Sequence, residues 1–191
     1  MVDETKKGAE RILQATIDVL LTNGLQAATT RQVTEQAGVG RGLLNHYYNW
    51  QELRVLAWEV IFEEVIHDQF AQFTAADQAI EYYLASAFTT DAPIYWKLWL
   101  EATDLAIHDQ VMAQALEKVQ QRMLTHLTES LAKGHAQGLW RLPDASATAL
   151  RLSALYDGLV GLLLSGATRL TAEEAEKHLR QQFSLETAQL T

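Results

Sequence analysis

Apolar positions recur three and four residues apart along most of the 191-residue chain, which is the spacing of one face of an α-helix. We find no segment in which apolar and polar residues alternate as they do in a strand. Only two prolines and ten glycines interrupt the pattern, so long helices are permitted over most of the length. The sequence therefore predicts an all-α fold of about nine helices.

The N-terminal part is predicted to begin with a helix over about residues 10–22, because an apolar stripe covers this range and Asn23-Gly24 can end a helix. Residues 1–9 are polar and are expected to be loose. A long helix is predicted over 51–73. It is apolar over most of its circumference, so we expect it to be buried on more than one side.

Residues 29–50 have a spacing that packing alone does not readily explain. Thr30 is a good N-cap for a short helix, whose Val33 and Ala37 lie four apart on one face. Gly38 can adopt the left-handed conformation that closes a helix, and a second short helix is predicted directly after it. Two short helices joined by a Gly-containing turn are the geometry of a helix-turn-helix, whose second helix enters the major groove of DNA.

The predicted second helix has an inner face of Leu43, Leu44 and Tyr48, and its other side chains suit contact with DNA. Arg41 can pair with phosphate or guanine, and Asn45 has the donor and acceptor that match adenine. The N-terminus of the preceding helix favours an anion such as phosphate. The predicted DNA-binding residues are Thr30, Arg31, Gln32, Gly40, Arg41, Gly42, Leu43, Asn45, His46, Tyr47 and Gln51.

The net charge of −9 is unusual for a protein that binds phosphates. Residues 1–60 carry a net charge of −1 and residues 61–191 a net charge of −8, so most of the acid lies outside the predicted helix-turn-helix. Lys6 and Lys7 are expected to touch phosphate as part of a flexible arm. The alternative interpretation is that residues 1–60 form an ordinary solvated helical surface.

Several short motifs resemble the tetracycline-repressor (TetR) family of bacterial transcription regulators. They are Thr29-Thr30-Arg31, Ala37-Gly38-Val39, and His46-Tyr47-Tyr48 followed by Leu53. The small polar Asn45 before His-Tyr-aromatic resembles the choline-sensing repressors. Many members have Tyr in place of Asn45 and Lys in place of Gln51, and both are phosphate contacts in the family.

The resemblance implies a homodimer that binds a double-stranded DNA operator and is most often a repressor released by a small molecule. It extends into the C-terminal half through Trp96 to Leu100 and Tyr156-Asp157-Gly158-Leu159. We expect a DNA-binding domain over 1–50 and a ligand-binding and dimerisation domain over 51–191, connected by the helix 51–73. An activator or a ligand-independent repressor with the same architecture is the alternative.

The C-terminal half predicts five more helices. They begin after residue 76, near Pro93, after an Asp109 cap, near Asp144 and at the Thr171–Glu174 capping box. The fourth of them, ending near residue 165, carries a stripe of small residues that includes two glycines. Because interior glycines disfavour a helix, the stripe indicates close approach by another helix. The predicted dimer interface is Ala154, Gly158, Gly161, Leu162, Ser165 and Leu179.

Aromatic residues are dense between positions 82 and 99, with acids close behind. They are either plain core or the wall of a pocket in which an effector packs on the rings. The effector would be cationic, with a carboxylate as its countercharge, or a neutral aromatic compound. The predicted effector-binding residues are Tyr83, Tyr95, Trp96, Trp99, Glu101, Asp104 and Tyr156.

Other functions receive little support. The chain has no cysteine, which excludes disulfides, thiol nucleophiles and Cys-ligated zinc. Glu64 and His67 form a single E-x-x-H without the second copy that a di-iron bundle needs, so we predict no metal, no cofactor and no catalytic residue. A helical metal-binding enzyme is the remaining rival. No signal peptide and no membrane span are predicted, so we expect a cytoplasmic protein.

Overall fold

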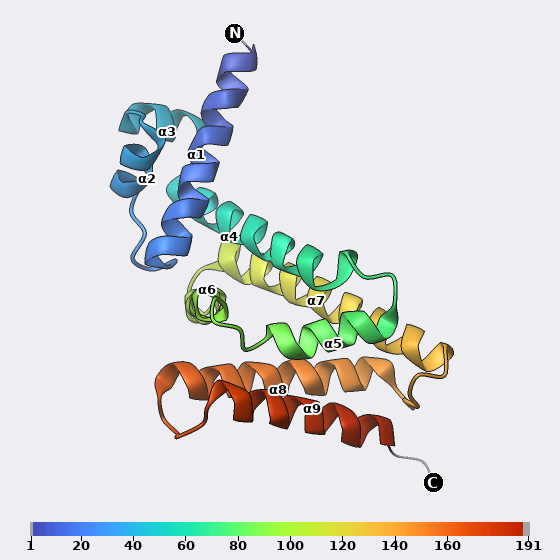
Figure 1. The fold of residues 1–191 in the computed structure, drawn as a ribbon. Coiled ribbons are helices and arrows are strands. Elements are labelled where there is room, and N and C mark those ends of the chain that lie inside the picture. The colour runs from blue at the N-terminus through green and yellow to red at the C-terminus, as the bar shows by residue number, and fades with distance from the viewer. Residues whose placement is uncertain (1, 189–191) are drawn as a thin grey trace. The chain divides into compact units, whose positions relative to one another are not determined.

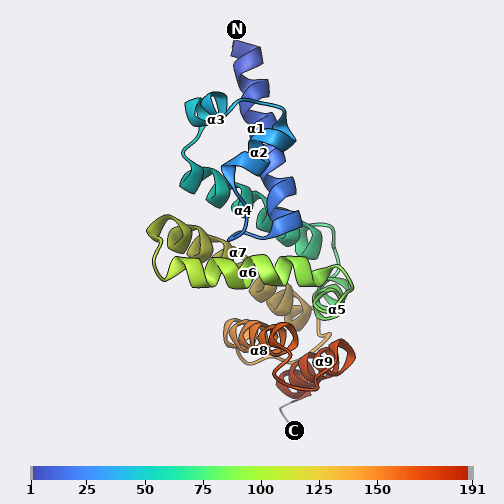
Figure 2. The same cartoon turned by 90° about the vertical axis from the view of Figure 1, so that its left-hand side faces the viewer.

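A computed structural model describes residues 2–188, which form nine α-helices and one π-helical turn (Figures 1 and 2). No strand occurs among these residues, and the all-α prediction is confirmed. The elements are α1 (Val2–Asn23), α2 (Thr30–Ala37), α3 (Arg41–Tyr47), α4 (Trp50–Ile66), η1 (His67–Ala71), α5 (Ala76–Ser86), α6 (Ala92–Ala106), α7 (Gln110–Ala136), α8 (Ala145–Ser165) and α9 (Ala172–Ala188).

The chain divides into two compact units. Unit 1 combines the residues up to Glu64 with Ile94–Val119, and unit 2 combines Val65–Pro93 with the residues from Gln120 onward. Unit 1 therefore holds α6 and the beginning of α7 in addition to the first four helices. The predicted boundary at residue 50 does not coincide with this division, and whether 1–50 folds independently stays a prediction.

Unit 1 is built around α1, with α2 and α3 lying along one side of it (Figure 1). Its core contains side chains with no exposed surface, contributed by α1, the α1–α2 loop, α2, α3 and α4: Leu20, Leu25, Val33, Leu44 and Leu53. We call the residues of α1 to α3 the reading head. Leu25, in the loop between α1 and α2, fills the core between the first three helices, and its side chain is completely buried.

Three predictions about the reading head are wrong. Helix α1 begins at Val2 and not near residue 10, so Lys6 and Lys7 lie in a helix and not in a loose arm. An ion pair between Lys6 and Glu10, at 3.9 Å, supports the added turn. The N-cap of α2 is Thr29 and not Thr30, and Leu43 is 38% exposed and so does not belong to the buried face of α3.

The predicted long helix 51–73 changes its hydrogen-bonding pattern before its end. Its α-helical part stops at Ile66 and is followed by the π-helical turn η1. In such a turn each backbone N–H bonds the carbonyl five residues before it, and π-helical turns occur often at functional sites. The two units meet in the sequence near this point, at Glu64 and Val65.

Unit 2 contains α5, the later part of α7, and the helices α8 and α9, which lie side by side in both views (Figures 1 and 2). Asp144 caps α8 by accepting a hydrogen bond from the backbone N–H of Ala147 at 2.9 Å. On α9, Glu186 accepts hydrogen bonds from Thr148 and Arg151 of α8, which lower its pKa to about 2. The predicted start of α8 is confirmed, and α9 runs from Ala172 to Ala188.

Helix α8 is the one helix among the described residues that is long and apolar enough to cross a membrane by length and composition. Only a third of its most apolar window is buried. Core helices of soluble proteins pass the same test. An apolar helix with so small a buried share has many apolar side chains that the described part of the chain does not cover.

Candidate DNA-binding, effector and dimerisation sites

Helix α2 is fixed at both ends by local hydrogen bonds. Thr29 and Gln32 form a capping box, in which each side chain accepts a hydrogen bond from the backbone N–H of the other. Gly38 ends the helix with φ 61° and ψ 40°, the left-handed conformation predicted for it. Because its amide oxygen belongs to the capping box, Gln32 is engaged in positioning α2 in this structure.

Helix α3 is exposed over most of its circumference. Leu44 is the one fully buried residue of this seven-residue helix. Tyr47 is half-buried, and a Cβ added to Gly8 of α1 would lie 3.2 Å from its hydroxyl oxygen. Beside it the hydroxyl of Tyr48 donates to the carbonyl of Ala9 at 3.3 Å. The exposed residues at the N-cap and along the helix are Gly40, Arg41, Gly42, Leu43, Asn45 and His46.

Two of the predicted phosphate contacts already have partners. The Nε of Arg31 donates to Glu35 at 2.8 Å on the exposed surface of α2. Gln51 hydrogen-bonds the carboxylate of Asp109, the residue that caps α7. Burial raises the pKa of Asp109, but hydrogen bonds from Gln51 and from the backbone of α7 outweigh burial and lower it.

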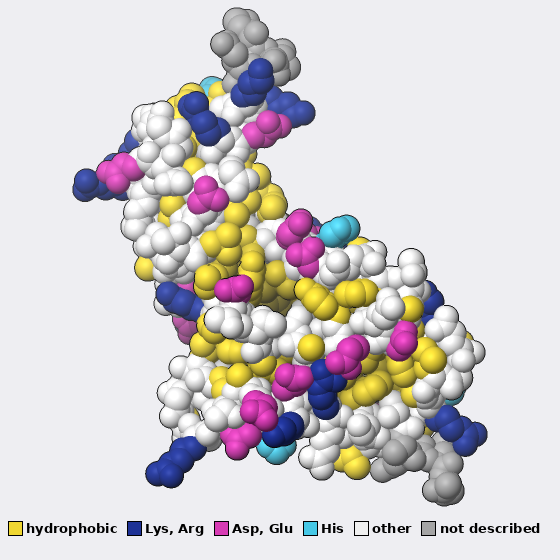
Figure 3. Space-filling model, viewed as in Figure 1, with side chains coloured by type: hydrophobic (Ala, Val, Ile, Leu, Met, Phe, Trp, Pro, Cys, Tyr) yellow, Lys and Arg dark blue, Asp and Glu magenta, His cyan; other side chains and the backbone are white. Residues whose placement is uncertain are grey.

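The reading head carries basic side chains without a continuous basic surface. Figure 3 shows Lys and Arg side chains in separate groups around it on this face, with acidic side chains between them. Arg41 is exposed and has no ion pair among the described residues, whereas Arg31 is paired with Glu35. Arg41 is therefore the cation of α2 and α3 that is most available to phosphate or a base.

The acids predicted as effector countercharges lie against the loop between α1 and α2. The Oε2 atom of Glu101 accepts hydrogen bonds from the backbone N–H groups of Leu25 at 2.5 Å and Gln26 at 3.3 Å. Asp104 accepts from the side chain of Gln26 at 2.9 Å. Both carboxylates thus hold the reading head against α6, and these hydrogen-bond partners all lie within unit 1.

Trp99 belongs to an aromatic group formed by α4 and α6 within unit 1. Its ring centroid lies 5.7 Å from that of Trp58 and 5.2 Å from that of Phe62. Trp58 is completely buried, and its indole N–H donates to the carbonyl of Leu98 at 3.1 Å. Trp96 is also buried, at 7% exposed, and Tyr95 is half-buried. These rings account for the α4–α6 contact.

A second aromatic group lies in unit 2 and contains the other two predicted effector residues, Tyr83 and Tyr156. The centroid of Tyr156 lies 6.2 Å from that of Tyr83 and 5.8 Å from that of Phe88. Phe70 of η1 stacks near Tyr83 and near His126 of α7. The seven predicted effector residues are therefore divided between two groups, one in each unit.

Asp157 lies beside the second group and was missing from the predicted site. Burial raises the pKa of Asp157 to about 6. The pKa of the buried Tyr83 hydroxyl is raised mainly by desolvation, and to a smaller extent by Tyr156 and by the charge of Asp157. Within residues 2–188 no hydrogen bond or ion pair to this carboxylate is found. The sequence offered a signal, because Asp157 is the one charged residue between Arg151 and Arg169 in a strongly apolar stretch.

We call Phe70, Tyr83, Phe88, His126, Tyr156 and Asp157 the aromatic–acid cluster. A half-buried carboxylate near aromatic side chains, with no ion pair to another described residue, is suited to a cationic ligand. The acidic residues predicted for this purpose, Glu101 and Asp104, have hydrogen-bond partners of the chain itself.

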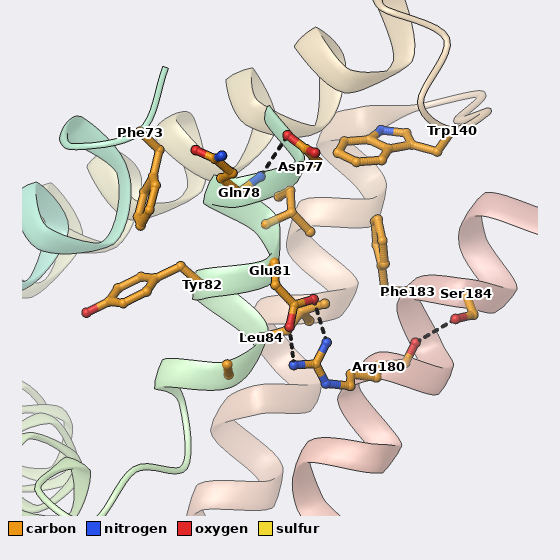
Figure 4. A pocket seen from close by; sticks show the side chains of 12 residues that line it. Phe73, Asp77, Gln78, Glu81, Tyr82, Leu84, Trp140, Arg180, Phe183 and Ser184 are labelled. Carbon is orange, nitrogen blue, oxygen red and sulfur yellow. Dashed lines mark hydrogen bonds and ion pairs between the residues drawn. The ribbon is translucent and has the colours of Figure 1, made fainter. Parts of the chain in front are cut away.

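An open groove of about 800 Å³ lies between α5 and α9 of unit 2 (Figure 4). Trp140 and Phe183 meet there edge to face, and Glu81 receives two hydrogen bonds from Arg180 at 2.7 and 2.6 Å. Arg180 also donates to Glu176. Since these charges neutralise one another, the groove is less suited to binding a charged ligand than the site of Asp157 is.

The predicted dimer residues of α8 lie on an uncovered face. Ala154, Gly158, Leu162 and Ser165 are exposed, and a Cβ added to Gly158 or Gly161 would meet no atom within 4 Å. A second groove, of about 750 Å³, lies beside them between α8 and α9 and is lined by Leu155, Leu162, Leu170 and Leu185 among others. Leu179 is completely buried within unit 2, so its assignment to the interface is wrong.

Comparisons with known proteins agree with this arrangement. Residues 12–49 match the family described as bacterial regulatory proteins, tetR family, and residues 74–185 match the BetI-type transcriptional repressor C-terminal domain. The HTH-type transcriptional regulator PksA of Bacillus subtilis is 26% identical over 188 residues, covering 92% of this chain and 88% of the relative. The regulator BetI of Vibrio vulnificus is 24% identical over 165 residues, covering 78% and 77%.

Solved structures share the fold at lower identity. A TetR transcription regulator from Haloarcula marismortui has a TM-score of 0.76 at 18% identity and covers 97% of this chain and 100% of its own. A transcriptional regulator from Saccharomonospora viridis, in complex with choline, has a TM-score of 0.78 at 19% identity and covers 92% and 95%. With the two family matches, these likenesses show that the chain belongs to the TetR family of DNA-binding transcriptional regulators, with a C-terminal domain of the BetI type.

Proposed function

We propose that this regulator is a homodimeric repressor that binds an inverted-repeat operator and leaves it when a cationic small molecule binds unit 2. The observation that supports DNA contact most directly is the exposure of α3, with Arg41, Asn45 and His46 on its surface and Leu44 as its anchor. The bacterial cytoplasm is the proposed site of action.

A two-fold dimer follows from the reach of α3. A helix of seven residues spans few base pairs, and a symmetric dimer doubles the sequence that is read. The uncovered apolar face of α8, with Gly158 and Gly161 open to close approach, supports contact with a second copy. In this proposal the second chain packs against Ala154, Gly158, Gly161 and Leu162.

The effector is proposed to bind at the aromatic–acid cluster, with Asp157 as countercharge and Tyr83 and Tyr156 as ring faces. The unpaired, half-buried carboxylate is the observation behind this choice. The choline complex of the Saccharomonospora viridis regulator supports a cationic ligand for a protein of this fold. To release the operator, the effector must bind better to the conformation that fits DNA less well.

Selection of bound duplexes from a random DNA pool tests operator binding. We expect an inverted repeat, and we expect Arg41→Ala and Tyr47→Ala to weaken binding to it at least 10-fold without loss of fold or dimer. Arg169→Ala, which removes an exposed cation from unit 2, is the matched control and should bind like the parent protein. Full-strength binding by both reading-head variants would exclude α3 as the reading helix.

Thermal-shift titration tests the effector site, with choline as the cationic probe and 3,3-dimethylbutanol as its uncharged analogue of equal shape. We expect choline to stabilise the parent protein more than the neutral alcohol does. Asp157→Asn should abolish that difference, and Asp91→Asn, which neutralises an exposed acid of unit 2, should retain it. Equal stabilisation of the parent by both compounds would exclude a countercharge role.

A further inference from the structure

We propose that Glu101, supported by Lys97 and Asp104, is the residue of α6 that positions the reading head for DNA. These three side chains, called the α6 clamp, hold the loop between α1 and α2 in a fixed place relative to α6. The inference rests on the proposed dimeric operator binding, since a fixed position matters only when two heads must fit two half-sites.

The clamp uses four contacts from one face of α6. Lys97, Glu101 and Asp104 are spaced four and three residues apart, which places them together on one side of the helix. Glu101 accepts from the N–H groups of Leu25 and Gln26, and Asp104 accepts from the Gln26 side chain. On the same face Lys97 donates to the carbonyl of Asn23 at 3.1 Å and lies 3.7 Å from Glu101.

The loop is held by the buried side chain of Leu25 and by the hydrogen bonds that its backbone makes to α6. The N–H groups of Leu25 and Gln26, just past the end of α1, donate to the carboxylate of Glu101 instead of to the carbonyl groups of the last helical turn. Hydrogen bonds to a carboxylate are roughly twice as strong as those between neutral groups. Glu101 is half-buried, so solvent weakens these bonds less than it would at the surface.

Gly24 gives an independent reason to regard the contact as specific. Its φ is +90°, which favours glycine, and a Cβ built at this position would lie 2.8 Å from Oε2 of Glu101 and 2.9 Å from Nζ of Lys97. The space that a side chain would take is occupied by the clamp. Glycine at position 24 therefore permits both the turn and the approach of α6.

The clamp also continues into the interior of unit 1. Between Lys97 and Glu101, the carbonyl of Leu98 accepts the indole N–H of the fully buried Trp58 on α4. Trp99 packs on Trp58 and Phe62. A shift of α6 would thus reach the reading head in two ways, through α4 and directly through Glu101, and the direct contact involves fewer intervening side chains.

The experiment measures how strictly the dimer demands the spacing of its half-sites. Duplexes carry the two selected half-sites with the spacer changed by one and two base pairs, and two base pairs displace a half-site by about 7 Å along the axis. We expect the parent to bind the altered spacers at least 10-fold more weakly. Glu101→Ala should reduce this penalty to about 3-fold or less, because its heads can pivot.

Two variants serve as matched controls. Glu101→Gln keeps one carbonyl oxygen that can accept both backbone hydrogen bonds, as the single Oε2 atom does here, and should keep the spacing preference. Glu117→Ala removes an exposed acid from the same unit and should behave like the parent. Fold and dimer are checked by thermal unfolding and sedimentation, and a loss of stability alone would not change the spacing preference of the folded dimers.

A folded Glu101→Ala dimer with the parent's spacing preference would overturn the proposal. If that variant does not fold, the double variant Lys97→Ala, Asp104→Ala tests the proposal in its place, because both side chains are exposed. We expect the double variant to lower the spacing penalty at least 3-fold. A parent protein that selects no inverted repeat would instead overturn the proposed operator binding, and the positioning role with it.

Discussion

The two units of this regulator leave different chemistry on their surfaces. In unit 1, α3 exposes Arg41, Asn45 and His46 around one buried leucine. In unit 2, α8 exposes Leu150 at 58%, Leu162 at 39% and Gly158, where an added Cβ would meet no atom within 4 Å. Each uncovered surface therefore matches a different partner, a polar one for hydrogen-bonding groups of DNA and an apolar one for another apolar surface.

The energetic consequences of the two surfaces also differ. Full burial of an exposed leucine is worth roughly 1.5–3 kcal/mol, so the exposed face of α8 could stabilise a dimer by several kcal/mol even when partly covered. Contacts from α3 would act mainly on affinity and sequence preference, at about 1–3 kcal/mol for each good bidentate base contact. Gly158 and Gly42 are comparable probes of the two surfaces, because a Cβ at either position meets no atom within 4 Å.

The largest effect is expected from Gly158→Leu. The side chain fits the isolated chain, since nothing lies near the position, but it would overpack a helix crossing by roughly 1–3 kcal/mol for each chain. We expect the variant to sediment as a folded monomer at low micromolar concentration. A normal dimer at that concentration would place the interface elsewhere.

The second effect is expected from Gly42→Leu, the same change in unit 1. Leucine has a higher helix propensity than glycine by roughly 0.5–1 kcal/mol, so the variant should be at least as stable as the parent. Its side chain would hold the backbone of α3 away from the groove, and we expect operator affinity to fall at least 10-fold while the dimer persists. Loss of the dimer in this variant would contradict the separation of the two surfaces.

Asp157→Asn tests whether unit 2 sacrifices stability to keep an unpaired charge. The pKa of Asp157 is raised to about 6 by burial, so its favourable contribution to folding is present below about pH 4 and lost as the pH rises through 6. The full difference would be about 3 kcal/mol, and partial exposure reduces it to about 1–2 kcal/mol. We expect the variant to be more stable than the parent at pH 7 by that amount, measured by denaturant unfolding.

At pH 4 the difference between the two free energies of unfolding should be much smaller, because Asp157 is then protonated in the folded parent and about half protonated in the unfolded parent. His126, which stacks near Phe70 and lies 3.8 Å from Glu129, is the same in both proteins, so the difference between their free energies of unfolding isolates Asp157. A variant that is less stable than the parent at pH 7 would indicate an ion pair at this carboxylate.

Local signals in the sequence were sufficient for most of the fold. The left-handed Gly38, the Asp109 and Asp144 caps and the Thr171–Glu174 capping box act within four residues, and each is found as predicted. Errors arose where neighbouring residues competed for one role. Thr29 and Thr30 are equally good caps by type, and the reciprocal hydrogen bond with Gln32 decides for Thr29.

The functional residues were harder to predict, because they depend on contacts between distant parts of the chain. Glu101 looks like a countercharge beside Trp99 in the sequence, but its partners are 76 and 75 residues away in the α1–α2 loop. Apolar periodicity places Leu179 on the apolar face of a helix but does not show what covers that face. In the structure, Leu179 is covered by other residues of unit 2. Nothing in the sequence around Trp58 indicates a hydrogen-bond partner for its indole N–H. The hydrogen bond to the carbonyl of Leu98 becomes apparent only in the structure.

The smallest effect is expected from Glu35→Gln, which tests how far unit 1 is limited by its own acids. Glu35 pairs with Arg31 at 2.8 Å, and both side chains are largely exposed. Exposed pairs of this kind contribute about 0–1 kcal/mol, so the fold should not suffer from the change. Freed from its partner, Arg31 at the start of α2 can turn to phosphate, and one repulsive charge is removed from the reading head.

We expect operator affinity to rise about 2- to 5-fold at low salt and the slope of log affinity against log salt to steepen. Unchanged affinity in Glu35→Gln, with Glu117→Ala as control for the loss of one acid elsewhere in unit 1, would mean that Arg31 does not reach the DNA and that Arg41 acts alone.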